Sequence, residues 1–193
     1  MDNQTIILAS QSPRRKYLLE QAGIVFEVLP SQIDENYFTH RRPATHVKKL
    51  ALAKAEDIAL KNPDRWVIGA DTIVFINASI LEKPTSKANA RMMLQKLGGK
   101  THQVYTGFAI CNYQQMHAHV DYVKTDVHFK KLSDAEIKWY LNTEEPYDKA
   151  GAYAIQGLGA SLIKKISGSY TNVVGLPVCE VVEHLMELGV VTR

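Results

Sequence analysis

The sequence has 193 residues, enough to bury a sizeable core without disulfides or a structural metal, and we expect a single domain over residues 1–193. Hydrophobic residues make up 46% and charged residues 22% of the chain, as in an ordinary soluble protein. The formal charge of +3, with basic residues scattered along the chain, argues against a nucleic-acid-binding protein, and no apolar run approaches membrane length.

The cysteines and the amino terminus bear on the cellular compartment. Cys111 and Cys179 lie far apart in apolar stretches, so we expect two reduced core thiols rather than a disulfide or a zinc site. The amino terminus lacks the basic segment and long apolar run of a signal peptide. We therefore expect a cytoplasmic protein with no membrane partner.

The amino-terminal part of the chain predicts a strand–helix–strand unit. The apolar runs 6–9 and 26–29 suit buried strands, and the stretch between them has helical spacing. Ser12 is a good N-cap, Pro13 suits the first helical position, and Gly23 can end the helix in a left-handed turn.

Strand and helix patterns alternate along the rest of the chain. Further helices are predicted at 44–60, 87–97, 134–141 and 177–188. Strands are predicted at 66–76, 79–84, 102–111 and 121–129, with short strands and turns over 151–170. This order predicts a mixed α/β fold, with a long twisted sheet, flanking helices and two lobes around a cleft.

Hydroxyls and guanidiniums gather where the first strand becomes a helix. Ser10, Ser12, Arg14 and Arg15 occupy this junction. Free backbone N–H groups at a helix start attract an anion, and arginine matches the geometry of phosphate. We interpret the junction as a phosphate-binding loop. The alternative is a capped helix with two solvated arginines.

Three charged residues lie where apolar ones are expected. Asp71 interrupts the apolar run 66–76, where an unpaired carboxylate would be costly, although Gly69 also permits a turn there. Lys54 falls on the apolar stripe of its helix, facing inward or extending to the surface. Glu35 follows the strand at 26–29, as site residues of α/β proteins often do, but acidic loops are ordinarily just solvated.

Together these residues have the chemistry of phosphoanhydride hydrolysis. Serine, arginine and lysine supply the donors and positive charge that a triphosphate requires. Two carboxylates, Glu35 and Asp71, can hold a hard divalent cation or activate water. A zinc site at His117 and His119 is disfavoured because the pair adjoins a turn and lacks a third ligand.

Seven motifs in order resemble the Maf family of nucleoside triphosphate pyrophosphatases. They are LASQSPRR (8–15), DE (34–35), KA (54–55), GADT (69–72), EKP (82–84), DKAGAYAIQG (148–157) and NVVGLP (172–177). The resemblance implies a fold like that of the inosine triphosphate pyrophosphatases. It also implies cleavage between the α and β phosphates, releasing a nucleoside monophosphate and pyrophosphate, with Mg²⁺ or Mn²⁺ as cofactor and a homodimer as the assembly.

The resemblance also implies residue roles. Asp71 matches the proton acceptor, and the polar residues of the phosphate and metal site match Ser10, Arg15, Glu35, Lys54 and Lys83. The metal would be held by Glu35, with Asp71. The positions that match the dTTP/UTP branch are Arg14, Thr72 and Gln156. A glutamine amide offers a donor and an acceptor, which complement the N3–H and O4 of uracil or thymine. Gln11 departs from the family pattern, in which a small residue is commoner.

Three other functions compete with this interpretation. A nucleotide-binding regulator of cell division or septum formation needs the basic residues but not Asp71. A pyrophosphatase for another or modified base would share the same chemistry. A nucleic-acid-binding module is disfavoured because the sequence has no basic stripe or stacking motif.

Overall fold

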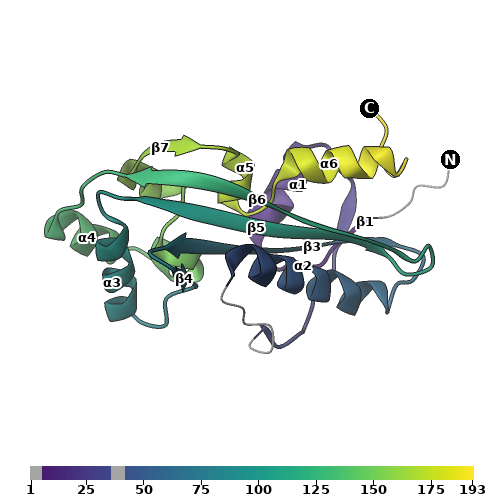
Figure 1. Cartoon of the computed structure of the whole chain (residues 1–193), viewed down its shortest axis with the longest axis horizontal. Helices are drawn as coiled ribbons and strands as arrows, with labels where there is room; N and C mark the ends of the chain where they lie inside the picture. Colours follow the sequence, from purple (N-terminus) through teal and green to yellow (C-terminus); the bar gives the residue numbers. More distant parts are fainter. Residues whose placement is uncertain (1–5, 36–41) are drawn as a thin grey trace. The chain divides into compact units, whose positions relative to one another are not determined.

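In a computed structural model, which describes residues 6–35 and 42–193, seven strands form one mixed sheet (Figure 1). Their order is β2-β1-β3-β5-β6-β7, with β4 paired to β3. The strands are β1 (Ile6–Leu8), β2 (Phe26–Val28), β3 (Trp66–Ile76), β4 (Ser79–Leu81), β5 (Thr101–Asn112), β6 (His117–Phe129) and β7 (Ile163–Ser167). β1 is parallel to both β2 and β3, whereas the pairs β3–β4 and β6–β7 are antiparallel. The predicted mixed α/β class is confirmed.

The chain divides into two compact units. The first unit comprises Met1–Asp71, Thr106–Val123 and Gly175–Arg193, and the second comprises Thr72–Tyr105 and Lys124–Val174. β3, β5 and β6 each have residues in both units. The single domain predicted over the whole chain stays a prediction.

The first unit contains α1 (Pro13–Gln21), α2 (Pro43–Ala59) and α6 (Val178–Glu187). Ser12 caps α1 as predicted, because its side chain accepts a hydrogen bond from the Arg15 N–H. α2 packs closely on β3, since a Cβ on Gly69 would overlap the Ala51 carbonyl oxygen. Gly107 allows the same close approach of β5 to Val47. The core between α2 and the sheet consists mostly of small residues for this reason.

The second unit contains three α-helices and three short 3₁₀ helices among its described residues. They are α3 (Lys87–Leu97), α4 (Asp134–Tyr140), α5 (Tyr170–Val174), η2 (Glu145–Asp148), η3 (Ala150–Ala152) and η4 (Gly157–Leu162). The predicted capping box of α4 is present, with Ser133 and Glu136 exchanging hydrogen bonds with the backbone. The core of this unit joins α3 and α4 to the sheet through Leu94, Ile137 and Val127.

Two predictions need correction. Over residues 151–170 the sequence predicted several short strands, but only β7 forms; the segment before it folds into 3₁₀ turns around left-handed Gly151 and Gly157. Cys179 is exposed rather than in the core, because the buried stripe of α6 runs through Val181, Val182 and Leu185. Cys111 is buried as predicted, burial raises the pKa of its thiol to about 12, and both thiols are free.

No helix within the described residues is long and apolar enough to span a membrane.

Candidate functional site

The predicted phosphate loop and the loop that carries Glu35 follow parallel strands of the first unit, and the predicted acid Asp71 lies within a third, β3. β1 pairs in parallel with β2 on one side and β3 on the other. The carboxyl ends of parallel strands meet at one edge of a sheet. Ser10 follows β1 there, Glu35 lies in the loop after β2, and Asp71 lies three residues beyond Ile68, which pairs with Leu8. Strand register therefore brings these distant segments together.

The loop after β1 is organised around Arg15. The buried Ser10 hydroxyl oxygen accepts hydrogen bonds from the Ser12 N–H at 3.2 Å and from Arg15 Nη1 at 3.0 Å. Arg15 Nε donates to the carbonyl oxygen of Gly175 at 2.8 Å. The guanidinium is thus fixed by two segments of the chain, 160 residues apart. A fixed guanidinium beside a helix start suits a phosphate oxygen.

Lys54 joins the two predicted carboxylates. Its ammonium lies 2.9 Å from Asp71 Oδ1 and 2.9 Å from Glu35 Oε1. The Lys54 and Asp71 side chains are only 11% and 10% exposed, whereas that of Glu35 is 59% exposed. Burial of Lys54 favours the paired alternative over a lysine that extends to solvent. The group is a buried ion pair with a third, solvent-facing charge.

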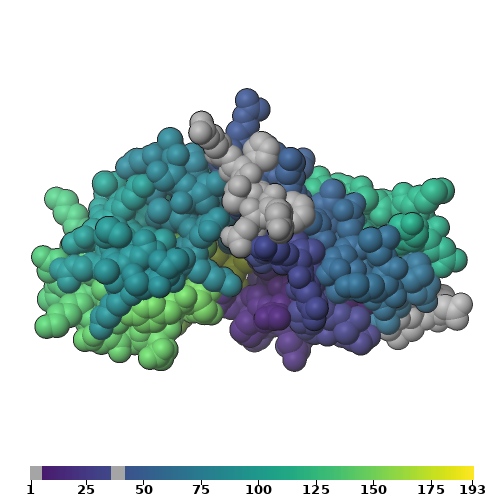
Figure 2. All heavy atoms as spheres, turned by 90° about the horizontal axis from the view of Figure 1, so that it is seen from below, coloured from purple at the N-terminus to yellow at the C-terminus, as the bar shows by residue number. Residues whose placement is uncertain are grey.

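Arg15 shares the electrostatic field of these carboxylates. Burial lowers the pKa of the Arg15 guanidinium, Asp71 raises it, Arg14 lowers it, and Glu35 raises it. The guanidinium stays protonated, since arginine does not lose its proton in proteins. Two cations and two carboxylates of the first unit therefore interact within one site. On the face shown in Figure 2, the amino-terminal segment in purple lies beside the blue segments that follow it.

A family model described as Maf-like protein matches residues 5–188. The chain belongs to this family. A dTTP/UTP pyrophosphatase of Citrifermentans bemidjiense is 51% identical over 189 residues, which cover 98% of this chain and 98% of that protein. Another, of Geotalea uraniireducens, is 52% identical over 186 residues, 96% of each chain. A solved structure, the Staphylococcus aureus Ham1 protein, is 16% identical with a TM-score of 0.48 over 82% of this chain and 79% of its own. That last likeness is too distant to carry an argument.

Most of the charged and hydroxyl-bearing residues that match Maf motifs lie together in the first unit. These are Ser10, Ser12, Arg15, Glu35, Lys54 and Asp71, with Arg14 beside Arg15 in the first turn of α1. Thr72, Lys83 and Gln156 belong to the second unit. There Thr72 continues β3, Lys83 is exposed after β4, and Gln156 precedes η4. Their participation in the same site stays a prediction.

Two residues that support the candidate site were given no role by the sequence analysis. Gly175, which lies in the NVVGLP motif, contributes its carbonyl oxygen to Arg15, and the role of a backbone group cannot be read from a side-chain pattern. Asp57 lies on α2, three residues after Lys54, and accepts hydrogen bonds from the Ser31 hydroxyl at 2.9 Å and the Gln32 N–H at 3.1 Å. It thereby ties the loop that carries Glu35 to the helix that carries Lys54. An aspartate on a solvated helix face is too common to have been singled out.

The donor set fits a divalent cation shared with a substrate. Within residues 6–35 and 42–193, no three histidine, cysteine or acidic side chains are arranged to hold a metal ion. Glu35 and Asp71 do approach one another through their common contact with Lys54. Mg²⁺ is commonly bound by one or two carboxylates plus substrate phosphates and water, rather than by an all-protein cage. Two carboxylates are therefore sufficient for such an ion.

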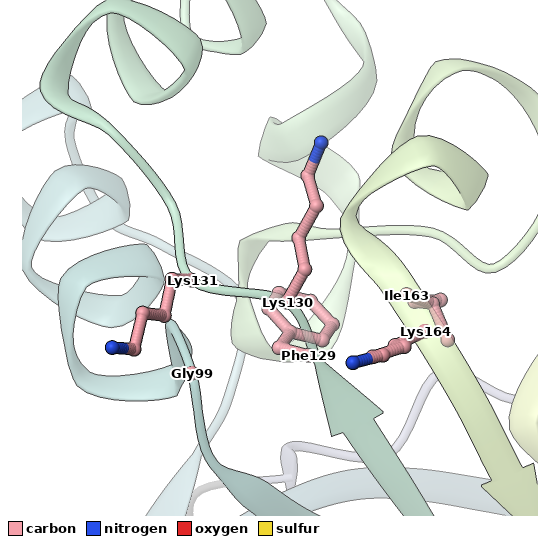
Figure 3. Close-up of a pocket in the computed structure, with 6 residues that line it drawn as sticks. All are labelled: Gly99, Phe129, Lys130, Lys131, Ile163 and Lys164. Carbon is pink, nitrogen blue, oxygen red and sulfur yellow. The ribbon is translucent and has the colours of Figure 1, made fainter.

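Two other clusters lie apart from the motif residues. His184 of α6 stacks on His119 with ring centroids 3.8 Å apart, and its Nε2 lies 3.2 Å from His117 Nε2. In the second unit, a hollow is lined by Gly99, Phe129, Lys130, Lys131, Ile163 and Lys164. Figure 3 shows the ammonium groups of the three lysines of this hollow at well-separated points. Lys130 also pairs with Glu136 at 2.7 Å, so the lysines do not converge on one anion.

Proposed function

We propose that this Maf protein hydrolyses dTTP and UTP to the nucleoside monophosphate and pyrophosphate. The observation that carries the proposal is Asp71, a buried carboxylate held 2.9 Å from Lys54 within the electrostatic reach of Arg15. Relatives about half identical over nearly their whole length are named dTTP/UTP pyrophosphatases, which supports the same activity here.

The reaction needs a base, a nucleophile and a leaving group. A water oxygen attacks the α-phosphorus, and the bond from that phosphorus to the α–β bridging oxygen breaks. The water proton passes to the Asp71 carboxylate, and pyrophosphate leaves with the bridging oxygen and its electron pair. Lys54 holds one Asp71 oxygen by its 2.9 Å contact, which leaves the other oxygen to orient the water.

Positive groups would neutralise the charge that develops on pyrophosphate. In the first unit these are Arg15, Lys54 and the backbone N–H groups at the start of α1, which Ser12 caps. Ser10 would position Arg15 through its 3.0 Å hydrogen bond. We assign Lys83 to the same task from its place in the EKP motif.

A divalent cation, Mg²⁺ or Mn²⁺, completes the proposal. Glu35 and Asp71 would hold it, and it would supply charge neutralisation at the phosphate oxygens. Glu35 is suited to an exchangeable ion because its side chain is 59% exposed.

Base preference is assigned to three positions. Arg14, Thr72 and Gln156 carry the residues expected of the dTTP/UTP branch. A glutamine amide can donate to O4 and accept from N3–H of uracil or thymine, whereas a carboxylate could only accept.

The homodimer implied by the family resemblance is also kept as a proposal, and light scattering of the purified protein would test it.

The deciding experiment measures pyrophosphate release from a panel of nucleoside triphosphates with Mg²⁺ or Mn²⁺. We expect dTTP and UTP to be hydrolysed fastest, and Asp71→Asn to lose turnover while still binding nucleotide. Asp64→Asn, an exposed aspartate just before β3, is the matched control and should keep full activity. A normal rate for Asp71→Asn refutes the base assignment. A preference for a guanine or inosine nucleotide refutes the substrate, and binding without turnover by the unaltered protein favours the regulator.

A further inference from the structure

The segment 153–159, which contains Gln156, wraps around one half-buried carboxylate of the second unit, that of Glu145. Glu145 Oε1 accepts a hydrogen bond from the Gly159 N–H at 2.8 Å, and Oε2 accepts one from the Leu158 N–H at 2.9 Å. The Tyr140 hydroxyl donates to Oε1 at 2.8 Å and accepts from the Ala154 N–H at 3.2 Å. Backbone groups on both sides of Gln156 are therefore held by one tyrosine–glutamate pair.

The fit around Glu145 is too close for ordinary side chains. Gly157 has φ +69°, and a Cβ there would overlap Glu145 Oε2. A Cβ on Gly159 would lie 2.7 Å from the Tyr140 hydroxyl oxygen. Two glycines that flank Leu158 thus let the backbone approach the carboxylate closely enough to donate both hydrogen bonds.

The tyrosine is fixed in the protonated form that this arrangement requires. Burial raises the pKa of the Tyr140 hydroxyl, and its hydrogen bond to Glu145 raises it further. The phenol therefore keeps its proton and donates to the carboxylate at neutral pH. Hydrogen bonds that involve an ionised group are the stronger kind.

A buried contact fixes the start of the segment. The Tyr153 hydroxyl oxygen lies 2.7 Å from His102 Nε2, and both side chains are buried. Tyr153 also packs edge-on against Phe129, with ring centroids 4.7 Å apart. Gln156 itself is half-buried, so a partly accessible amide lies on a backbone anchored before and after it.

We propose that Glu145, supported by Tyr140, is a positioning residue for base selection, which fixes the backbone of Gln156 so that its amide meets the base edge in one orientation. This inference rests on the proposed function, because it takes Gln156 as the group that reads the base. Discrimination between bases by an amide depends on which of its two ends faces the base, and that requires a fixed backbone. The groups assigned to bond cleavage, apart from Lys83, lie in the first unit, so a loosened segment should impair selection more than chemistry.

The test is Glu145→Gln, with the ratio of kcat/KM for UTP to that for CTP as the readout. Glutamine keeps the size of the side chain but turns an amide NH₂ toward a backbone donor. CTP presents an amine and a bare N3 where UTP presents O4 and N3–H. We expect the UTP:CTP ratio to fall about tenfold, the effect of losing one hydrogen bond to a charged group. Glu144→Gln makes the same charge change at the exposed neighbouring position and should leave the ratio unchanged.

Two further measurements separate positioning from a loss of folded protein. Tyr140→Phe removes the hydroxyl but keeps the ring in the core, and it should lower the ratio in the same direction. Amide hydrogen exchange should become faster at Leu158 and Gly159 in Glu145→Gln, and not in Glu144→Gln. In a Gln156→Ala background, Glu145→Gln should change the ratio no further, because its effect passes through Gln156.

The possible results distinguish the two proposals. If Gln156→Ala lowers the UTP:CTP ratio but Glu145→Gln and Tyr140→Phe reduce both kcat/KM values by one common factor, the positioning role is wrong and the proposed function stands. If Gln156→Ala leaves the ratio unchanged, the base-reading role of Gln156 is wrong, and the positioning role is overturned with it.

Discussion

The Lys54 ammonium lies 2.9 Å from the Asp71 carboxylate, and both side chains are almost completely buried. The close packing of α2 on β3 brings them together. Gly69 of β3 has no Cβ, so the α2 backbone at Ala51 and Ala55 can approach the strand closely. Lys54 adjoins Ala55, and Asp71 lies on the same strand face as Gly69, two residues on. A buried charge pair of this kind is costly to form, so its members depend strongly on one another.

Removal of Lys54 should therefore damage stability and activity together. Lys54→Met leaves the buried Asp71 carboxylate without its closest cation, and we expect a loss of about 3–5 kcal/mol in the free energy of unfolding. Urea denaturation would measure it. The double variant Lys54→Met, Asp71→Asn should regain much of that stability yet remain inactive. Lys61→Met, which breaks an exposed pair with Asp57, is the control; an equal loss there would contradict the prediction.

Gly69→Ala should displace α2 from the sheet. The added methyl group would overlap the Ala51 carbonyl oxygen and crowd Ala55, so the helix must shift, at a cost of about 1–3 kcal/mol. Because Lys54 moves with the helix, the rate of dTTP hydrolysis should fall further than the loss of folded protein explains. Gly98→Ala is the control, since its Cβ would meet its nearest neighbours at 3.4 Å. Full activity in Gly69→Ala would show that the close approach does not position Lys54.

The sequence predicts the part of the site that is encoded in single residues. An acid inside an apolar run and a lysine on an apolar stripe are local anomalies, and both proved to be members of one buried pair. Ser12 and Pro13 likewise define the start of α1 by local chemistry alone. Such features are predictable because the neighbouring residues in the sequence are enough to show that each one breaks or follows a known preference.

The remainder depends on contacts between distant segments. The Gly175 carbonyl group accepts a hydrogen bond from Arg15 only because the chain returns to α1 after 160 residues, and the NVVGLP motif by itself does not reveal this contact. Glu145 resembles any acidic residue of a turn until Tyr140 and two glycines are placed around it. The segment 151–162 was misassigned for the same reason, since its turn at Leu158 and Gly159 is held by that half-buried carboxylate rather than by intrinsic propensity.

Asp57→Asn should weaken the loop that carries Glu35. A hydrogen bond from Lys61 lowers the pKa of Asp57, burial opposes this, and hydrogen bonds from the Gln32 N–H and the Ser31 hydroxyl lower it further. The carboxylate therefore stabilises the fold above its ordinary pKa, and this contribution is lost as the pH falls through the lower folded value. We expect the variant to need more Mg²⁺ for half-maximal activity and to lose less stability than the parent on acidification. Glu56→Gln, exposed on the same helix, is the control; an unchanged Mg²⁺ requirement in Asp57→Asn would contradict the proposed link to Glu35.

The buried His102 should make the protein sensitive to mild acid. Burial, with a smaller effect of His128, lowers the pKa of His102 to about 3, so the folded protein keeps this imidazole neutral. The unfolded chain takes up a proton near pH 6.5 and the folded chain does not, so stability is complete above pH 6.5 and declines below it. The slope due to this one proton is at most about 1.4 kcal/mol per pH unit.

This contribution can be isolated with a variant that removes the whole polar pair. Burial also lowers the pKa values of His117 and His119, so the parent protein should show their effects as well. His102→Phe with Tyr153→Phe leaves apolar rings in the same core, where Phe129 already packs edge-on against both positions. The free energy of unfolding, measured by urea denaturation between pH 7 and pH 4, should decline less steeply in this variant than in the parent. The difference in slope should be at most that of one proton. Parallel curves would mean that His102 is protonated in the folded state, and that its contact with Tyr153 is made by an imidazolium.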